Sequence, residues 1–431
     1  MIPSKYNINI KDDNNYIIFN ILNGKVIKIS EKIYNYCLND ELEFYDIFSK
    51  EKIKFISNNF FVKSHTIELN ELISKFNNMK FGNQTLTLTI LTNLDCNMTC
   101  KYCHENGFLT KEYIGIETEN KILKWLNNQI NTYGYKKLII YYYGGEPLLN
   151  MRFINSFSKK VRQLSSIKKI DVDFTLTTNG TLLDDKIVCD LLDNNIRSIQ
   201  VSIDGDKYIH DKRRQLKNGC SSFDVIMEKI NLYKQKLDFT IRCNVDNQNK
   251  DRIENLMMYL KENNLNKYIK FYIDFVSQTH NKTSHNNKYL LKNTKEMIYI
   301  TSLWKKQLDY GLELYGKNII EGLCGNVNKS NITINPNGDI YICPGLCGID
   351  QLKVGNIDTG FNKLMDIFEK VNIWENCLDC KYLPMCSGGC RAQSYITTGD
   401  CMSCYCKKDF YDYAVEKYIK LKYNKYFYEN Y

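Results

Sequence analysis

The middle of the chain, from about residue 85 to residue 276, alternates short apolar segments with longer amphipathic ones. The short segments have the length and apolar content of β-strands, and they are Leu86–Asn93, Lys137–Tyr143, Val172–Thr178, Ser198–Ile203, Phe239–Val245 and Ile269–Val276. The longer segments between them predict helices over Glu117–Thr132, Met151–Leu164, Asp184–Asn194, Phe223–Lys236 and Arg252–Asn263. Strands that alternate with helices predict a parallel sheet with right-handed crossovers.

Residues 1–80 have a different pattern and predict a separate small domain. Two short apolar runs, Tyr16–Asn20 and Lys25–Ile29, flank Asn23-Gly24, which is a hairpin signal. Further elements are expected as a helix from Ser30, helices over Glu43–Asn58 and Thr66–Asn77, and a short strand at Phe60–Val62. This mixture of elements is typical of a winged-helix-like module. An equally good interpretation is a module that only packs against the next domain and covers it.

Composition narrows the class of protein. The chain has 431 residues, enough for two or three domains, and its 17 cysteines are far above ordinary usage. The sequence shows no secretory leader and no apolar run of the ~18 residues that a membrane span needs. In a cytoplasmic protein, clustered cysteines indicate metal binding rather than disulfides. The formal charge of +9 is dispersed, so neither nucleic acid nor a membrane is an expected partner.

The first cysteine cluster follows the first predicted strand of the sheet. Cys96, Cys100 and Cys103 have the spacing C-x3-C-x2-C. Three thiolates on one loop can hold three irons of a [4Fe–4S] cube, which leaves the fourth iron open to a small molecule. Because the loop leaves the carboxyl end of a strand, it lies where α/β folds place their chemistry. The alternative is a zinc site, for which His104 is the only local fourth ligand.

This loop resembles the cluster loop of the radical S-adenosylmethionine (radical SAM) superfamily, where an aromatic residue precedes the last cysteine, as Tyr102 does here. The resemblance implies a (β/α)6 partial TIM barrel for the six-strand region. It also implies that the open iron binds SAM. One electron would then cleave SAM into methionine and a 5′-deoxyadenosyl radical, which takes a hydrogen atom from the substrate.

Later strands end in further motifs of the same superfamily. The second strand ends in GGEP, where two glycines allow close backbone approach to a ligand. By resemblance, this motif contacts the amino group of SAM, and the serine of SIDG lies near the carboxylate or ribose. The residues that we assign to cofactor binding are Tyr102, Gly144, Gly145, Glu146, Pro147, Thr178, Asn179, Ser202, Asp204, Arg214 and Arg242. A plain turn would explain Asn179-Gly180 equally well. An ion pair would explain either of the adjacent arginines, Arg213 and Arg214, of which Arg214 better matches the superfamily's spacing.

The last third of the chain holds ten cysteines at regular spacings. Cys324 and Cys343 fit the pattern C-x9-15-G-x4-C. The pattern C-x2-C-x5-C-x3-C is fitted by Cys377, Cys380, Cys386 and Cys390. This series resembles the SPASM domain, an auxiliary iron–sulfur domain of radical SAM enzymes, and INPNGDIYIC supplies its expected hairpin. The alternative is a pair of zinc-ribbon sites, which the first C-x2-C pair would fit alone.

The SPASM resemblance implies two auxiliary [4Fe–4S] clusters. The first set of ligands would be Cys324, Cys343 and Cys390, with Cys347 as the fourth or with one iron open to a substrate thiolate. The second set would be Cys377, Cys380 and Cys386, with Cys406 as the favoured fourth ligand and Cys401 and Cys404 as alternatives.

We therefore expect an α/β enzyme with three domains: residues 1–80, a radical SAM partial barrel over 85–310 and a SPASM domain over 320–431. Auxiliary clusters suit a reaction that removes a second electron or binds a substrate thiol. We thus expect a maturase that installs a Cys thioether in a ribosomal precursor peptide, with residues 1–80 binding the leader as an added strand. Flavodoxin or ferredoxin would supply electrons.

Three alternatives to the thioether maturase stay open at this point. They are a formylglycine-forming sulfatase maturase, a carbon–carbon crosslinking maturase and a non-catalytic electron carrier. The sequence identifies neither the substrate nor a catalytic base.

Overall fold

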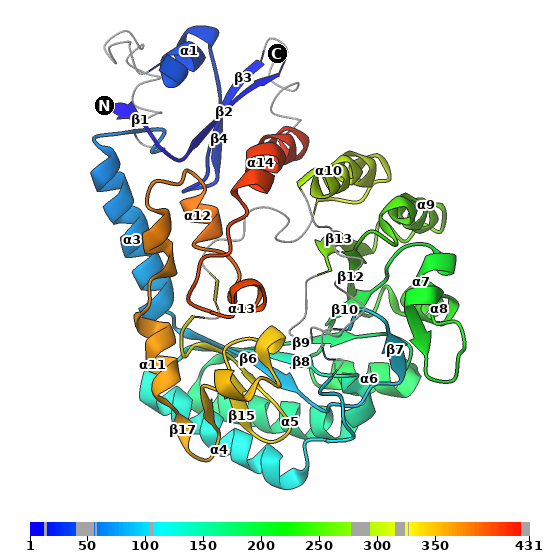
Figure 1. Ribbon diagram of the computed structural model, residues 1–431. Helices are drawn as coiled ribbons and strands as arrows, with labels where there is room; N and C mark the ends of the chain where they lie inside the picture. Colours follow the sequence, from blue (N-terminus) through cyan, green and yellow to red (C-terminus); the bar gives the residue numbers. More distant parts are fainter. Residues whose placement is uncertain are drawn as a thin grey trace.

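The computed structural model describes residues 1–12, 15–39, 56, 58–103, 105, 107–276, 294–314, 324–325 and 327–423. A ten-stranded sheet lies at its centre, with the strand order β13-β12-β10-β9-β8-β6-β14-β15-β16-β17. A long helix, α3 (His65–Phe81), connects this part of the molecule to a small amino-terminal sheet (Figure 1). His104 and most of the helix predicted over Glu43–Asn58 lie outside the described residues.

The six predicted strands are confirmed, and they pair in parallel as consecutive neighbours in the sheet. They are β6 (Thr85–Leu91), β8 (Lys137–Tyr143), β9 (Asp171–Thr178), β10 (Ser198–Ser202), β12 (Asp238–Val245) and β13 (Ile269–Phe275). Parallel neighbours need long crossovers, and the five predicted helices supply them as α4 (Ile116–Tyr133), α5 (Met151–Lys168), α6 (Asp185–Asp193), α8 (Phe223–Tyr233) and α9 (Ile253–Glu262).

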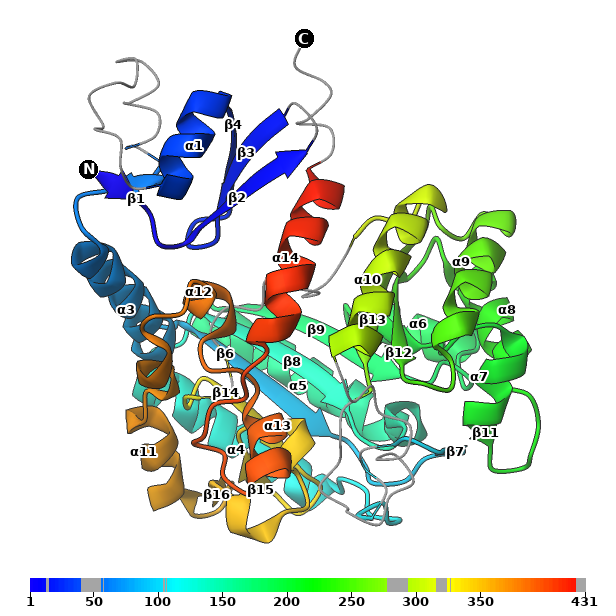
Figure 2. The same ribbon diagram turned by 45° about the horizontal axis from the view of Figure 1, so that its top comes forward.

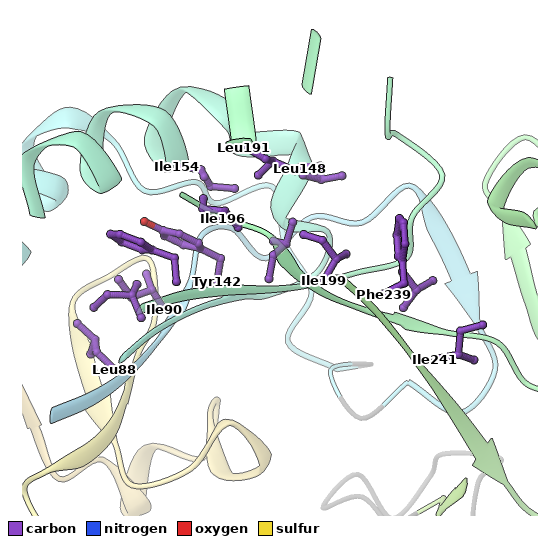
Figure 3. Packing of buried hydrophobic residues seen from close by; sticks show 14 of the residues in the cluster. Leu88, Ile90, Tyr142, Leu148, Ile154, Leu191, Ile196, Ile199, Phe239 and Ile241 are labelled. Carbon is purple, nitrogen blue, oxygen red and sulfur yellow. The ribbon is translucent and has the colours of Figure 1, made fainter. Parts of the chain in front are cut away.

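Successive residues of these strands point to opposite faces of the sheet. On one face, Leu88, Ile199 and Ile241 are fully buried in the cluster that the crossover helices complete (Figure 3). On the other face, Ser202 and Arg242 are only half-buried and pair in register between β10 and β12. The apolar face therefore holds the sheet together, and the polar face is available for a site.

The main sheet continues into the last third of the chain. Strand β14 (Asn331–Ile334) pairs in parallel with β6 and antiparallel with β15 (Asp339–Tyr341), and β16 (Gly355–Asn356) and β17 (Gly360–Phe361) follow. The predicted hairpin in INPNGDIYIC is thus confirmed, and Gly338 has the positive φ of +79° that its turn requires. The cysteine-rich third is anchored to the six-strand region by the pairing of β14 with β6.

The amino-terminal residues form a three-stranded antiparallel sheet of β2 (Asn7–Asp12), β3 (Asn15–Asn20) and β4 (Lys25–Ile29). Helix α1 (Glu31–Asn39) follows, and β1 (Ile2–Pro3) pairs with β5 (Phe61–Val62). The predicted hairpin, first helix and short strand are confirmed, whereas β2 was not predicted. Whether this arrangement is a winged helix stays a prediction.

The amino-terminal sheet packs against the last helix of the molecule, α14 (Lys408–Lys422) (Figure 2). Tyr6, Ile8 and Ile17 share a buried cluster with Phe410 and Tyr418. The other helices of the carboxyl-terminal half are α10 (Thr294–Asp309), α11 (Lys363–Lys370), α12 (Leu383–Cys386) and α13 (Arg391–Thr398). Across the described residues, none of the helices combines the length and apolar character that a bilayer crossing demands.

Candidate active site

A cavity of about 410 Å³ opens on the polar face of the sheet. One wall carries the three cysteines of the first cluster, Cys96, Cys100 and Cys103, and another carries Cys343 and Cys390 of the carboxyl-terminal third. Residues that are far apart in the sequence therefore face a common space.

The loop that carries the first three cysteines is held by a short two-stranded sheet. Strand β7 (Met98–Cys100) pairs antiparallel with β11 (Arg214–Leu216), which places Arg214 directly opposite Cys100. Burial raises the pKa of the Cys96 thiol to about 12, so metal binding at this loop must displace a proton. Within the described residues, no three His, Cys, Asp or Glu side chains are grouped closely enough to hold a single metal ion.

The two glycines of GGEP accommodate the protein's own backbone. Gly144 has a φ of +124°, and a Cβ atom there would lie 2.4 Å from the carbonyl oxygen of Asn93. A Cβ atom on Gly145 would lie 2.1 Å from the carbonyl oxygen of Asp95. Both glycines are needed because the end of β8 contacts the segment that leads into the cysteine loop. They also line the cavity.

Glu146 is buried and links the end of β8 to the end of β9 through hydrogen bonds. Its carboxylate accepts hydrogen bonds from the Thr178 hydroxyl at 2.6 Å, the Asn179 backbone N–H at 2.7 Å and the Leu148 backbone N–H at 3.0 Å. Burial raises its pKa, although these three donors oppose that effect. Thr178 and Asn179 line the cavity, whereas Glu146 and Pro147 are not among its lining residues.

Tyr102 accepts hydrogen bonds from Arg214, which is a predicted site residue, and from Asn244, which is not among the assigned residues. Arg214 Nη1 donates to its hydroxyl at 2.6 Å, and Asn244 Nδ2 donates at 3.2 Å. All three residues line the cavity together with Ser202 and Arg242. The aromatic residue of the cysteine loop is therefore joined to the ends of β11 and β12.

Asp204 and Arg213 lie behind this wall rather than on it. Arg213 Nη1 contacts both carboxylate oxygens of Asp246 at 2.8 Å, and its Nε lies 3.5 Å from Asp204 Oδ2. Asp204 is fully buried and is not among the lining residues of the cavity. Of the two adjacent arginines, Arg213 is engaged in ion pairs, and Arg214 faces the cavity, as the superfamily spacing favoured.

Three cavity-lining side chains have buried polar atoms without a hydrogen-bond partner among the described residues: Glu105 Oε1, Arg214 Nε and Arg242 Nε. Glu105 was not predicted, because nothing in the sequence marks it beyond its place two residues after Cys103. Burial, reinforced by the nearby Glu146 carboxylate, raises the pKa of Glu105 to about 8. The cavity thus offers one hydrogen-bond acceptor and two cationic donors to a ligand.

Comparison with known proteins matches residues 90–260 to the Radical SAM superfamily. The chain carries a radical SAM domain. It is 25% identical to the radical SAM cyclopropyl synthase TigE of Paramaledivibacter caminithermalis, over 100% of this chain and 98% of that protein. It is 25% identical to a cysteine-type anaerobic sulfatase-maturating enzyme of Clostridium perfringens, over 76% of this chain and 96% of that protein.

A solved structure has the same fold over almost the whole chain. The complex of Streptococcus suis SuiB with its precursor peptide SuiA gives a TM-score of 0.51 at 17% sequence identity, covering 94% of this chain and 99% of SuiB. This likeness concerns the fold alone, whereas the matched radical SAM domain and the two relatives at 25% identity are what make the chain similar to radical SAM enzymes of the maturase type.

The cavity of this radical SAM domain fits SAM in its charge pattern. The unpartnered donors of Arg214 and Arg242 match the carboxylate of SAM in charge, and the unpartnered oxygen of Glu105 is a hydrogen-bond acceptor for its amino group. Asn179 extends its amide toward the cysteine loop, where Nδ2 lies 4.0 Å from Cys96 Sγ. Arg242 also pairs with Asp274 at 2.8 Å, which fixes the guanidinium at the rim of the cavity.

The carboxyl-terminal cysteines separate into two groups. Cys343, Cys390 and Cys401 belong to or pack against the main apolar cluster, whereas the second predicted set, Cys377, Cys380 and Cys386, packs against the other cluster, beside α14. Cys347 is buried beside Leu91, and its Sγ lies 3.8 Å from the Cys343 carbonyl oxygen. Among the described residues no cysteine forms a disulfide.

The second group surrounds a small pocket of its own. Five cysteines line it: Cys377, Cys380, Cys386, Cys404 and Cys406. The Sγ atoms of Cys377 and Cys404 are 3.6 Å apart, and Cys406 is exposed. A pocket lined by five thiols fits the donor chemistry of an iron–sulfur cluster.

Proposed function

We propose that this protein is a radical SAM peptide maturase that installs a Cys thioether crosslink in a ribosomal precursor peptide. One observation carries the proposal: a single cavity borders both the cysteine loop of the radical SAM domain and Cys343 and Cys390. A substrate in that cavity would lie between a radical source and an electron acceptor. SuiB, which shares the fold over nearly the whole chain, was solved with a precursor peptide.

The proposed cofactors are SAM and three [4Fe–4S] clusters, bound by the cysteine sets that the spacings predict. When bound, SAM and its cluster would supply a 5′-deoxyadenosyl radical for hydrogen abstraction. An auxiliary cluster held by the predicted cysteines would supply an acceptor for the electron released when the thiol loses its proton and the C–S bond forms. The chain's own residues hold SAM through Arg214, Arg242 and Glu105. Tyr102 keeps Arg214 in place.

A second candidate is cyclopropane formation on a peptide. It is favoured by the relative TigE, a cyclopropyl synthase whose alignment covers 100% of this chain. The sulfatase-maturating relative covers 76% of the chain, so formylglycine formation has less support. A carbon–carbon crosslink stays open as a third product.

Anaerobic reconstitution with iron, sulfide, SAM and dithionite tests the enzyme class. We expect about twelve irons per chain, four for each cube, and formation of 5′-deoxyadenosine. A content of about four irons per chain would contradict the proposed auxiliary clusters. If no 5′-deoxyadenosine is formed, the proposed radical SAM reaction is wrong.

Mass spectrometry of a product peptide separates the candidate reactions. Formation of a thioether or of a cyclopropane removes two hydrogen atoms from the peptide. Only the thioether leaves one cysteine without a free thiol. Alkylation with iodoacetamide should therefore fail at one cysteine of the product and succeed in the untreated peptide. A product that loses two hydrogens and is still fully alkylated would overturn the thioether in favour of a ring or a carbon–carbon bond.

The fourth ligand of the second auxiliary cluster is tested by two serine variants. The sequence spacing favours Cys406, whereas the 3.6 Å distance between Cys377 Sγ and Cys404 Sγ favours Cys404. We propose Cys404, and expect Cys404→Ser to lose about four irons per chain while Cys406→Ser retains them. The reverse result would restore Cys406.

A further inference from the structure

Arg391 directly follows Cys390 and is almost completely buried, with 1% of its surface exposed. Its guanidinium donates four hydrogen bonds, all to backbone carbonyl oxygens. Nη1 donates to Cys401 at 2.9 Å and Ser403 at 3.1 Å, and Nη2 donates to Gly388 at 2.7 Å and Gly389 at 2.9 Å.

These carbonyls belong to the two loops that carry cysteines of both auxiliary sets. Gly388 and Gly389 lie between Cys386 of the second set and Cys390 of the first. The other loop runs through residues 401–406 and carries the remaining three cysteines. The two loops are in direct contact, because the Tyr405 backbone N–H donates to the Gly388 carbonyl at 3.0 Å. Arg391 therefore joins the loops at the boundary between the two predicted clusters.

The charge of Arg391 has no carboxylate partner in the described part of the chain. Burying an unpaired cation is costly unless negative charge lies nearby. The carbonyl oxygens that accept from Arg391 include those of Cys401 and of the residues directly beside Cys404 and Cys390. These cysteines come from both groups, so the negative charge of thiolate-ligated clusters would balance the guanidinium from two sides.

We propose that Arg391 is a positioning residue that holds the two auxiliary centres together and raises the reduction potential of both. The inference rests on the proposed function, since it needs the auxiliary clusters. A fixed positive charge beside a cluster stabilises the reduced state, which carries one more negative charge. Net charge and hydrogen bonding around a cluster are established determinants of its potential.

The experiment compares full-length wild type with Arg391→Lys, Arg391→Gln and the control Arg197→Gln, all reconstituted anaerobically. Arg197 is exposed on the radical SAM domain. Iron content and redox titration followed by electron paramagnetic resonance are the readouts. We expect Arg391→Gln to shift the auxiliary couples to lower potential or to lose auxiliary iron. The reduction potentials of Arg391→Lys should stay closer to wild type than those of Arg391→Gln, because lysine keeps the charge although it cannot donate all four hydrogen bonds, and Arg197→Gln should be unchanged.

Equal behaviour of Arg391→Lys and Arg391→Gln would overturn the proposal, because a role in packing alone moves both variants alike. Unchanged potentials and iron content in Arg391→Gln would overturn it as well. The failure of the proposed function is distinguishable, because wild type itself would then hold about four irons per chain instead of about twelve. That result would remove both proposals before any variant is measured.

Discussion

The imidazole of His210 makes hydrogen bonds through both of its nitrogens, one of them to the backbone just after β10. The backbone N–H of Asp204 donates to His210 Nδ1 at 3.3 Å, so Nδ1 carries no proton. The proton is therefore on Nε2, which lies 3.1 Å from the Ser222 hydroxyl, and that hydroxyl in turn donates to the Arg214 carbonyl. A neutral imidazole thus supports the backbone of a residue that faces the cavity.

The stability of the protein should depend on pH through His210. Burial, reinforced by the positive charge of Arg214, lowers the pKa of His210 from 6.5 to about 4. As the pH falls below 6.5, the unfolded chain binds a proton that the folded protein excludes, so the free energy of unfolding decreases until the pH reaches about 4. Its limiting slope is about 1.4 kcal/mol per pH unit.

The variant His210→Gln should flatten this decrease when thermal unfolding is followed between pH 6.5 and pH 4. His65→Gln, at an exposed histidine on α3, is measured beside it as the control for loss of an imidazole. Parallel pH profiles for wild type and His210→Gln would contradict the assignment.

Tyr102→Phe should weaken SAM binding without disturbing the fold. The hydroxyl is the common acceptor of Arg214 and Asn244, and its loss leaves a buried guanidinium donor without its partner. The cost should be about 1–3 kcal/mol, which corresponds to a rise of roughly fivefold or more in the dissociation constant for SAM. Anaerobic equilibrium dialysis gives that constant.

Tyr310→Phe is the matched control for this variant. It removes a hydroxyl that donates to Glu254 at 3.3 Å, away from the cavity. Its SAM affinity should equal that of wild type. If both tyrosine variants bind SAM as wild type does, the hydroxyl of Tyr102 has no part in the site.

Among the secondary-structure elements, the end of β8 depends most on glycine. At Gly145 a methyl group would meet the Asp95 carbonyl at 2.1 Å, and backbone cannot move away as a flexible side chain can. Gly145→Ala should therefore separate β8 from the cysteine loop, lower the free energy of unfolding by about 1–3 kcal/mol and impair cluster retention at Cys96, Cys100 and Cys103.

Gly115→Ala is the control for that substitution, because nothing lies within 4 Å of its Cβ position and its φ is negative. Iron content and thermal unfolding of the two variants should differ clearly. A Gly145→Ala protein with wild-type iron content would show that the loop adapts to the extra methyl group.

Across the whole molecule, α3 joins the amino-terminal sheet to the cysteine-rich third (Figure 2). Near its end, the buried Lys80 ammonium donates to the Val371 carbonyl at 3.0 Å and to Asn372 Oδ1 at 3.3 Å, and it lies 5.3 Å from the centre of the Trp374 ring. Phe76 packs on the same ring. These contacts hold the segment just before the second cysteine group.

Lys80→Ala should lower the free energy of unfolding by about 1–3 kcal/mol, because two half-buried acceptors lose their donor. Lys75→Ala on the exposed side of the same helix should change it by less than about 0.5 kcal/mol. Thermal unfolding of the reconstituted proteins measures both. Equal stability of the two variants would show that α3 is not anchored through Lys80.

Local patterns were enough to predict the parallel strands, their crossover helices and the cysteine loop. Alternating and amphipathic segments depend on neighbours within a few residues, so they are visible in one sequence. The short strand β2 was missed. The hairpin of β14 and β15 was predicted, but the pairing of β14 with β6 some 240 residues earlier was not, because no local signal records it.

For the site as well, some features could be predicted from the sequence and others could be seen only in the tertiary structure. Cysteine spacings and the GGEP and SIDG motifs are visible in the sequence. They were sufficient to indicate a radical SAM domain, and they also predict auxiliary clusters. Only the tertiary structure decided that Arg214 faces the cavity while Asp204 lies behind it, that Glu105 has an unpartnered oxygen there, and that Cys343 and Cys390 share this space. Spacing along a chain specifies which groups are available, whereas burial and direction depend on packing between segments that are far apart in sequence.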